Sequence, residues 1–213
     1  MYNDITAAIL SGGKSTRMGE NKSLMKIGEK AVIERVKELL GPLFHKVNLI
    51  TNDPEEYSFL KLETYGDIYP GRGPLAGIHS ALINSGTDKC FIISCDIPLM
   101  KSQMIEYLVK FPTDKMITIA RANGFVQQLC GLYHKNCIPE AENILSVKEL
   151  SEIRAPGQRE RRCSVLELIG KVGAEIIDAA KLPFYADDMY YNMNRKEEFE
   201  YVKSRLLTDA GEC

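Results

Sequence analysis

The sequence predicts an α/β fold of three layers, in which a mostly parallel β-sheet carries helices on both of its faces. Through the first half of the chain, short apolar runs alternate with segments whose apolar residues recur at helical spacing. This is the order that βαβ units produce. The apolar runs have no polar side, as expected for strands that are covered on both faces. At 213 residues, the chain suits one such domain.

The helices and strands of the first half follow from local patterns. Strands are expected at residues 5–10, 46–51, 60–65 and 90–95. Helices are expected at residues 31–40, 74–84 and 103–111. Pro74 occupies the first position of the second helix, where proline is favoured. Ser102 is a candidate N-cap for the third helix.

The second half is less regular and predicts an antiparallel addition to the sheet. Strands are expected at residues 115–120 and 125–133, and helices at residues 136–147 and 197–206. The short Arg-Ala-Asn-Gly connection means that the two strands form either a hairpin or a separate antiparallel addition. Residues 149–162 carry many charges with Pro156 and Gly157, which predicts a mobile loop. The basic run 159–162 is interpreted as a solvated surface, with anion binding as the alternative.

Composition and charge exclude several classes of protein. A net charge of −2 gives no broad positive field for nucleic acid or a membrane surface, so an anionic ligand must be held by local groups. Residues 1–10 carry Asp4 where a signal peptide would be basic, and no apolar run is long enough to span a membrane. We therefore expect a cytoplasmic protein. Cys90, Cys95 and Cys130 lie in apolar runs and are expected to be reduced core residues.

In an open parallel sheet, ligands bind beyond the carboxyl ends of the strands, and four segments there are chemically unusual. The first, residues 10–22, holds three glycines, two lysines and an arginine. Such glycines allow backbone amides to approach a phosphate, while Arg17 and Lys22 supply positive charge for a polyphosphate. A P-loop is disfavoured because the motif requires a glycine where Ala8 stands.

The second and third segments follow later strands. Residues 67–77 place Gly71, Gly73 and Ala76 in a loose dinucleotide-binding pattern, although a tight turn into a helix that favours bound anions is the safer interpretation. Asp96 stands directly after the most apolar strand, where a buried carboxylate is costly unless it is paired or holds a cation. Since Mg²⁺ prefers one or two carboxylates together with substrate phosphates, Asp96 is the candidate metal ligand.

The fourth segment, residues 191–194, precedes the last expected helix. Its pattern alone makes Asn194 a helix N-cap. Asn192 has no such structural role and could reach the site. Its residues alone therefore favour a capping function over a ligand-binding one.

Taken in order, these segments resemble the MobA family of molybdenum cofactor guanylyltransferases, within the wider nucleotidyltransferase group with a Rossmann-like sheet. The wider group shares Leu-Ser-Gly-Gly…Arg-Met-Gly…Lys at residues 10–22 and Cys-Asp-Ile-Pro at residues 95–98. The narrower family adds Gly-Pro-Leu-Ala-Gly at residues 73–77 and Asn-x-Asn at residues 192–194. The resemblance implies one nucleotidyltransferase domain over residues 1–213. Its nucleotide-binding half would be residues 1–100 and its acceptor-binding half residues 101–213.

The resemblance also implies a role for each matching residue. Residues that would bind the nucleotide are Leu10, Ser11, Gly12, Gly13, Lys22, Asn52, Asp67 and Asp96. Residues that would act in catalysis are Lys22, Arg17 and Asp96, with Mg²⁺ on Asp96. Residues that would bind the acceptor are Asn192 and Asn194.

Four positions depart from the family's pattern. Asn21 stands where members usually have aspartate before the lysine, which removes one carboxylate near the phosphates. Arg195 and Lys196 replace a usual Thr-Pro after the late motif, on the acceptor side. Ser11 replaces a common alanine, which is a mild change.

The implied reaction is attack of an acceptor phosphate on the α-phosphorus of GTP, with release of pyrophosphate. The implied acceptor is molybdopterin or molybdenum-molybdopterin, and the product would pass to molybdoenzymes or their chaperones. A phosphate monoester is already anionic near neutral pH, so no strong general base is required. The residues themselves leave the choice of base open, and guanine rests on the resemblance at residues 73–77.

Two other functions remain open at this stage. A cytidylyltransferase or a sugar-phosphate nucleotidyltransferase would share the first and third segments. A non-catalytic nucleotide-binding adaptor on the same fold would fit the departures at Asn21, Arg195 and Lys196. The presence of Lys22 and Asp96 favours an enzyme over the adaptor.

Overall fold

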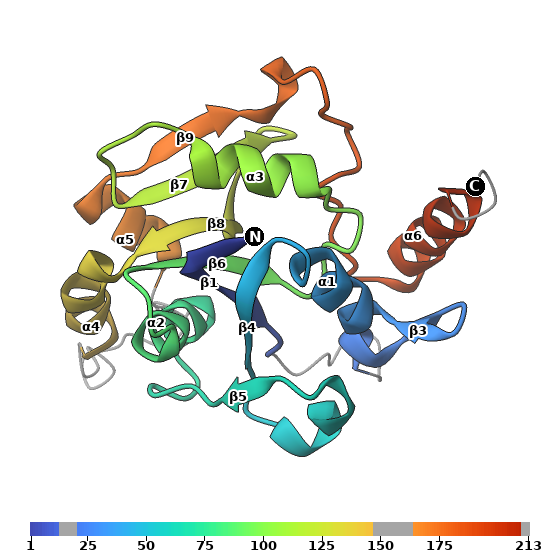
Figure 1. Ribbon diagram of the computed structural model, residues 1–213, viewed down its shortest axis with the longest axis horizontal. Coiled ribbons are helices and arrows are strands. Elements are labelled where there is room, and N and C mark those ends of the chain that lie inside the picture. The colour runs from blue at the N-terminus through green and yellow to red at the C-terminus, as the bar shows by residue number, and fades with distance from the viewer. Residues whose placement is uncertain (13–20, 147–163, 210–213) are drawn as a thin grey trace, which may run out of the picture.

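The computed structural model describes residues 1–12, 21–146 and 164–209. Within these ranges, a seven-stranded sheet has the strand order β5-β4-β1-β6-β8-β7-β9 (Figure 1). Its parallel part consists of β1 (Tyr2–Leu10), β4 (Phe44–Ile50), β5 (Glu63–Tyr65) and β6 (Lys89–Ser94). The remaining strands are β7 (Ile117–Ala122), β8 (Phe125–His134) and β9 (Glu175–Asp178). The expected sheet, mostly parallel with an antiparallel addition, is confirmed.

The parallel strands β1, β4, β5 and β6 have their carboxyl ends in register. Leu10 at the end of β1 pairs with Ile50 of β4 on one side and with Ser94 of β6 on the other. Ile50 in turn pairs with Tyr65 of β5. Because these four ends are in register, the segments that follow them lie side by side along one edge of the sheet.

Helices cover both faces of the sheet, as expected for a three-layer α/β fold. The helices that share core clusters with the sheet are α1 (Val32–Leu40), α2 (Pro74–Asn84), α3 (Ser102–Lys110), α4 (Ile138–Ser146) and α5 (Val165–Val172), and the last helix is α6 (Lys196–Asp209). Buried residues of α1 and α3 share one core cluster with Ile9 of β1. Buried residues of α2, α4 and α5 share a second cluster with Leu10. Successive residues of β1 thus face opposite layers, as strand geometry requires.

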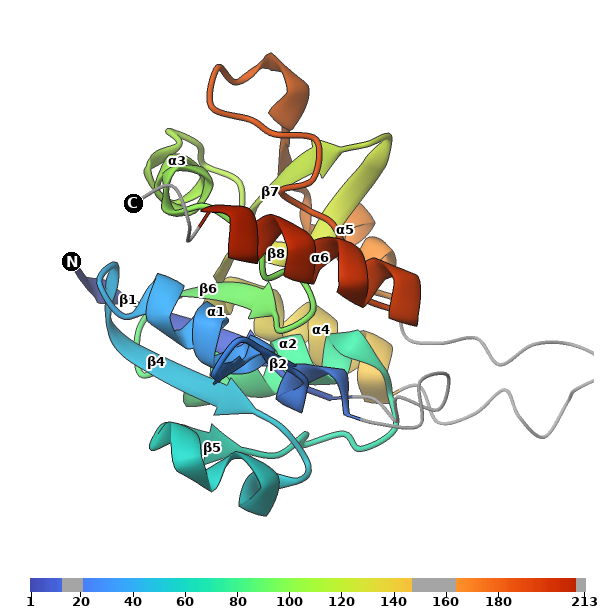
Figure 2. The same ribbon diagram turned by 90° about the vertical axis from the view of Figure 1, so that its right-hand side faces the viewer.

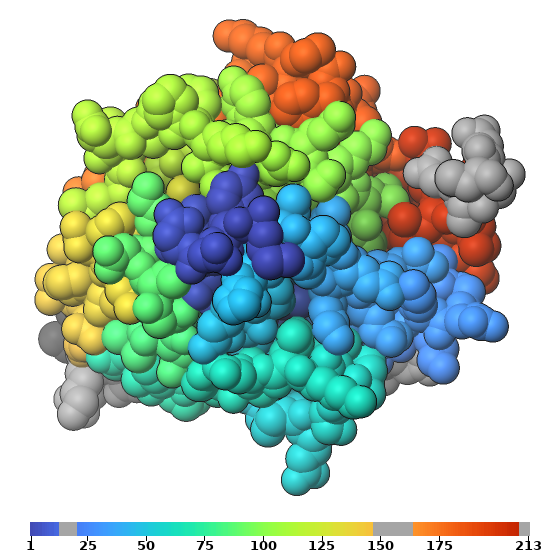
Figure 3. Space-filling view, in the orientation of Figure 1, coloured from blue at the N-terminus to red at the C-terminus, as the bar shows by residue number. Residues whose placement is uncertain are grey.

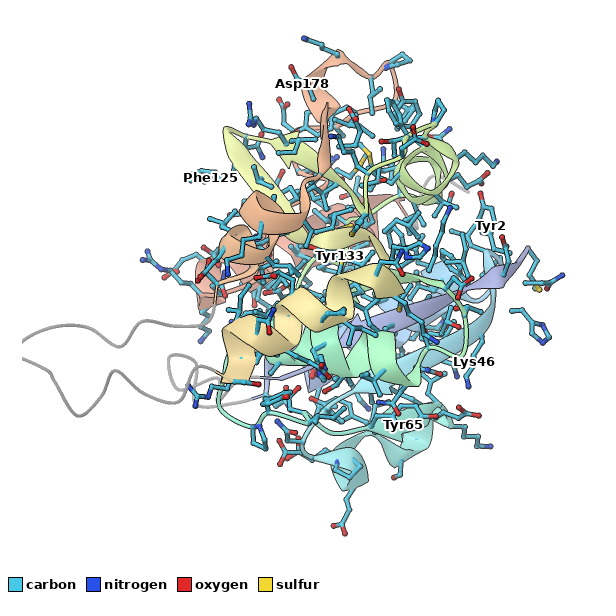
Figure 4. The ribbon with its side chains drawn as sticks, turned by 90° about the vertical axis from the view of Figure 1, so that its left-hand side faces the viewer. Tyr2, Lys46, Tyr65, Phe125, Tyr133 and Asp178 are labelled. Atoms are coloured by element: carbon cyan, nitrogen blue, oxygen red, sulfur yellow. The ribbon has the colours of Figure 1, made fainter. Side chains whose placement is uncertain are left out.

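The antiparallel addition is also a hairpin, so both interpretations of this region hold. β8 pairs in antiparallel fashion with β6 and with β7. Asn123 and Gly124 connect β7 to β8 with φ values of 53° and 80°, the positive φ pair that two-residue hairpin turns favour. Phe125 follows this turn at the periphery of the molecule (Figure 4). β9 then joins β7 in parallel at the sheet edge.

The last helix packs against a small hairpin rather than against the sheet. This hairpin pairs β2 (Lys26–Ile27) with β3 (Lys30–Ala31). A third core cluster joins Ile27 of the hairpin and Leu99 to Phe199 and Val202 of α6. Figures 1 and 2 both show α6 beside this hairpin. In Figure 2, α6 begins near the carboxyl ends of the parallel strands and runs back along the molecule.

Several expected boundaries were wrong, each for a local reason. The strand expected at residues 60–65 begins only at Glu63, because Pro54–Leu60 forms a 3₁₀ helix and Lys61 adopts a left-handed φ of 53°. Ser102 is not the N-cap of α3; Lys101 takes that position, and no side chain caps the helix. The charged segment 149–162 lies outside the described residues. Among those described, no helix combines the length and apolar character needed to cross a membrane.

Candidate functional site

The candidate site lies along the carboxyl edge of the parallel strands. Backbone hydrogen bonds continue the register past the strand ends: Ser11 N donates to Ile50 O at 2.9 Å, and Cys95 N donates to Leu10 O at 3.1 Å. The start of the chain fills the centre of the face in Figure 3, which views the opposite, amino-terminal edge of β1. The segments that follow β1, β4, β5 and β6 therefore begin at the far edge.

The loop after β1 presents open backbone. A Cβ atom added at Gly12 would meet nothing within 4 Å, so an anion can approach the main chain there. Ser11 is buried and its hydroxyl donates to Tyr57 Oη at 2.8 Å. Gly13 and Arg17, which were predicted to bind the nucleotide and its phosphates, lie outside the described residues.

Lys22 lies at the start of a short 3₁₀ turn (Lys22–Leu24) that follows this loop. Its ammonium Nζ donates to Asn194 Oδ1 at 2.8 Å. Asn21 accepts from Ser23 N and thus caps the turn. The structure therefore joins the first and fourth predicted segments directly. The expectation that the Asn194 side chain caps the last helix was wrong, because this side chain turns toward Lys22.

Asp96 lies beside the same segment. Its backbone carbonyl accepts from Met193 N at 3.0 Å, which places Asn192 and Asn194 on either side of that contact. The carboxylate atom Oδ1 of Asp96 is buried and has no hydrogen-bond partner among the described residues. Burying a carboxylate oxygen without a hydrogen-bond partner costs free energy unless a cation binds it.

The nucleoside-side candidates form a reciprocal pair. Asn52 Nδ2 donates to Asp67 Oδ2 at 2.9 Å, and Asp67 N donates to Asn52 Oδ1 at 2.8 Å. Gly66 lies beside this pair, where a Cβ would make an ordinary contact with Asn52 Oδ1 at 3.4 Å. A Cβ at Gly77 in the first turns of α2 would lie 3.8 Å from Asp67 Oδ1. The N-terminal part of α2 thus borders the same pair.

Sequence reasoning missed Tyr57. This residue comes from the Pro54–Leu60 turn, and its side chain is only 3% exposed. Its phenol oxygen contacts Ser11, Asn21 and Ser23, each at 2.8 Å. A tyrosine in a segment whose acidic residues are typical of an exposed surface carries no sequence signal for such a contact.

The Cys95 thiol lies near this group. Burial raises the pKa of that thiol to about 12, so it stays protonated.

A large surface hollow lies elsewhere. It has a volume of about 620 Å³ and is lined mainly by aromatic and aliphatic atoms of α3 together with Phe184. None of the predicted site residues that the structure describes lines it. The site is therefore defined by convergent polar groups at the strand ends and not by this hollow.

Open glycine backbone, a lysine and a buried carboxylate meet at the ends of parallel strands. This arrangement suits an enzyme that handles the phosphates of a nucleotide, and the class it defines is the nucleotidyltransferases. Residues 7–162 match the MobA-like NTP transferase domain, and the chain belongs to that family.

Curated relatives extend the similarity over most of the chain. A protein of Carboxydothermus hydrogenoformans, named a probable molybdenum cofactor guanylyltransferase, is 32% identical over 92% of this chain and 94% of its own length. A protein of the same name from Clostridium perfringens is 35% identical over the same shares. The crystal structure of molybdopterin-guanine dinucleotide biosynthesis protein A from Archaeoglobus fulgidus matches with a TM-score of 0.75. At 21% identity over 95% of this chain and 99% of that one, it supports the fold alone.

Proposed function

We propose that this nucleotidyltransferase transfers GMP from GTP to the terminal phosphate of molybdenum-molybdopterin or molybdopterin. An oxygen of the acceptor phosphate bonds to the α-phosphorus, the bond from that phosphorus to the β-phosphate oxygen breaks, and pyrophosphate leaves. The names of the relatives support the choice of GTP and acceptor. The observation that carries the proposal is the contact of Lys22 with Asn194 beside Asp96. It brings a residue assigned to the nucleotide against one assigned to the acceptor.

Lys22 has the central chemical task. Its ammonium stabilises the negative charge that grows on the phosphate oxygens in the transition state, a role that fixed charged donors perform best in a preorganised site. Asn194 Oδ1 accepts a hydrogen bond from one of its three N–H groups and leaves the other two for phosphate oxygens. The acceptor phosphate is largely ionised near neutral pH, so the chain has to position it and need not deprotonate it.

Asp96 fits a divalent cation. Its buried Oδ1 lacks a hydrogen-bond partner among the described residues, and carboxylate oxygen is a ligand that Mg²⁺ prefers. Within the same residues, no three His, Cys, Asp or Glu side chains gather into a metal site, so substrate phosphates would supply further oxygens. Asp96 would thus hold Mg²⁺, which supplies charge neutralisation at the α-phosphate.

The remaining assignments divide the chain into two halves. Residues 1–100 would bind the nucleotide, with the backbone of Leu10 to Gly12 at the phosphates and the Asn52–Asp67 pair at the nucleoside. Residues 101–213 would bind the acceptor, with Asn192 and Asn194 nearest the reacting phosphate. In this assignment Gly13 would bind the nucleotide, and Arg17 would stabilise the departing pyrophosphate.

Pyrophosphate release tests the proposal. Purified protein with Mg²⁺ receives GTP, CTP, ATP or UTP in turn, with and without molybdopterin or its molybdenum form. Release with GTP alone, and only when the acceptor is present, is the expected result. Release with CTP instead would keep the chemistry and overturn the choice of base. Bound GTP without any release would favour a nucleotide-binding adaptor.

A further inference from the structure

A buried group of hydroxyls lies beneath the Lys22 turn. Tyr57 forms its centre, and its phenol oxygen contacts Ser11 Oγ, Asn21 Nδ2 and Ser23 Oγ at 2.8 Å each. Ser11, Ser23 and Tyr57 are each at most 3% exposed. Buried polar networks are rigid when every member is satisfied and costly when one is not. This group therefore fixes the segments that contribute to it.

The hydrogens of this network can be assigned by elimination. The Asn21 carbonyl oxygen can only accept, so Ser23 Oγ donates to it at 2.7 Å. Ser23 then has no second hydrogen to donate, and Tyr57 must donate to Ser23. The Tyr57 oxygen accepts from Ser11 Oγ and from Asn21 Nδ2. Ser11 in turn accepts from the Cys95 thiol at 3.6 Å.

The resulting chain of donors has one direction and joins three parts of the site. It starts at Cys95, immediately before Asp96, passes Ser11 in the loop after β1 and ends at Asn21, immediately before Lys22. Ser23 directly follows the first predicted segment, and Tyr57 lies outside all four segments. Removing its hydroxyl leaves Ser11 and Ser23 without their shared partner in a site closed to water.

Asn21 also depends on a charge from the Tyr57 segment. Its amide nitrogen donates to Glu56 Oε2 at 2.8 Å as well as to Tyr57. A carboxylate at position 21 could still accept from Ser23, but its second oxygen would face the Glu56 carboxylate and the Tyr57 oxygen. Like charges at this distance repel. The amide at position 21 is thus matched to the carboxylate of Glu56.

We propose that Tyr57 and the Asn21–Glu56 pair are positioning residues that set the place of the Lys22 ammonium relative to Asp96. Neither Tyr57 nor Glu56 touches the reacting atoms in this assignment. Both act through the turn that carries Lys22. This inference rests on the proposed function, because it takes Lys22 as the residue that stabilises the transition state.

The variant Tyr57→Phe tests the role of Tyr57 at the centre of this network. A small misplacement of a charged group in the transition state lowers kcat more than it lowers substrate binding. We expect kcat to fall about tenfold or more while the KM for GTP changes less than about threefold. The matched control is Tyr133→Phe, which also removes a buried phenol bonded to one carbonyl but lies in the interior away from the strand ends (Figure 4). Unchanged kcat in Tyr57→Phe would overturn the proposal, as would an equal loss in the control.

The variant Asn21→Asp tests the pairing of the Asn21 amide with the Glu56 carboxylate. We expect turnover to fall about tenfold, because a small shift of the Lys22 turn misplaces its ammonium, and to recover to within about threefold in the double variant Asn21→Asp with Glu56→Gln. An amide at position 56 can donate to the new carboxylate, whereas a purely structural loss would not be rescued by it. Additive losses in the double variant would contradict the pairing.

Hydrogen exchange separates this inference from the proposed function. If the wild-type protein transfers no nucleotide at all, the proposed function fails while the network can still be measured. Tyr57→Phe should then speed amide exchange in a peptide spanning residues 21–27 by about tenfold and leave residues 117–134 unchanged. Equal exchange in the variant and the wild type would overturn the positioning role.

Discussion

The ammonium of Lys22 and the side-chain oxygen of Asn194 lie 2.8 Å apart, although 172 positions separate the two residues. Met25, which follows the Lys22 turn, and Met193, which precedes α6, belong to one apolar cluster with Ile27 of the β2–β3 hairpin. One cluster of apolar residues thereby holds the two ends of the chain together. It places the nucleotide-side lysine beside the residues assigned to the acceptor.

Asn194→Ala tests this contact. Lys22 would lose the neutral acceptor that orients its ammonium, and we expect kcat to fall about tenfold, the scale of one hydrogen bond to a charged group. Steady-state pyrophosphate release measures the change. Asn143→Ala, at an exposed position of α4 where the side chain donates to Glu140, is the control and should keep wild-type turnover. Equal activity in both variants would remove Asn194 from the site.

Asp96→Asn tests the cation ligand. The amide keeps the shape of the side chain and removes its charge, so we expect turnover to fall about 10² or more and the Mg²⁺ requirement to shift to higher concentration. Lys22→Ala should lose turnover on the same scale. Asp178→Asn is the matched control, because β8 and β7 separate its strand from β6 and Figure 4 shows it at the far end of the sheet from Tyr65. Full activity in Asp96→Asn would refute the assignment.

The Asn52–Asp67 pair should act as one unit in nucleotide binding. Asn52→Ala removes both hydrogen bonds of the pair, whereas Asp67→Ala removes the side-chain bond and keeps the backbone N–H of residue 67 as a donor. We expect the KM for GTP to rise about three- to tenfold in each variant. The double variant should be no worse than the more damaging single one, since the partner is already lost. Glu63→Gln at the start of β5 is the control. Additive effects would mean that the two residues bind independently.

Buried thiols should make the protein less stable in alkali. Burial raises the pKa of Cys90 from 9.0 to about 12, so between these pH values the unfolded chain has lost a proton that the folded chain keeps. The unfolded state then binds fewer protons, and the free energy of unfolding falls as pH rises through this window, by up to about 1.4 kcal/mol per pH unit for one group.

In the variant Cys90→Ala, the free energy of unfolding should therefore fall less steeply as pH rises. Urea unfolding at several pH values measures it: the variant is less stable than wild type at neutral pH, because a buried side chain is truncated, but its stability declines less steeply in alkali. Ile92→Val on the same strand truncates a buried side chain that carries no titratable group, and it should keep the wild-type slope. Equal slopes in all three proteins would contradict the effect.

Much of the fold could be predicted from the sequence because its signals are local. Apolar runs that are covered on both faces identify β1 and β6 within a few residues, and Pro74 marks the start of α2. β9 and α5 were not expected. β9 has only four residues, too few to show alternation, and its pairing with β7 is a tertiary contact.

The residues of the candidate site could likewise be predicted only in part. Asp96 directly after β6 and Lys22 at the end of the segment that follows β1 were predicted from the rule that ligands bind at the carboxyl ends of parallel strands. Asn194 was identified through the resemblance, but its local pattern wrongly indicated a helix cap. Tyr57 could not be found, because its role depends on a 3₁₀ turn that folds back beneath the β1 loop. Contacts between segments that are far apart in the sequence produce no recognisable pattern of residue spacing.

The central claim is nucleotidyl transfer to a phosphate at the Lys22–Asp96 site. The most direct measurement supplies the enzyme, Mg²⁺ and molybdenum-molybdopterin with GTP labelled either at the α-phosphate or at the γ-phosphate. We predict that the α-label enters the dinucleotide product and the γ-label leaves as pyrophosphate, with both signals lost in Lys22→Ala. A γ-label transferred to the acceptor, or an α-label that remains in GTP or appears only as free GDP or GMP, would contradict the account.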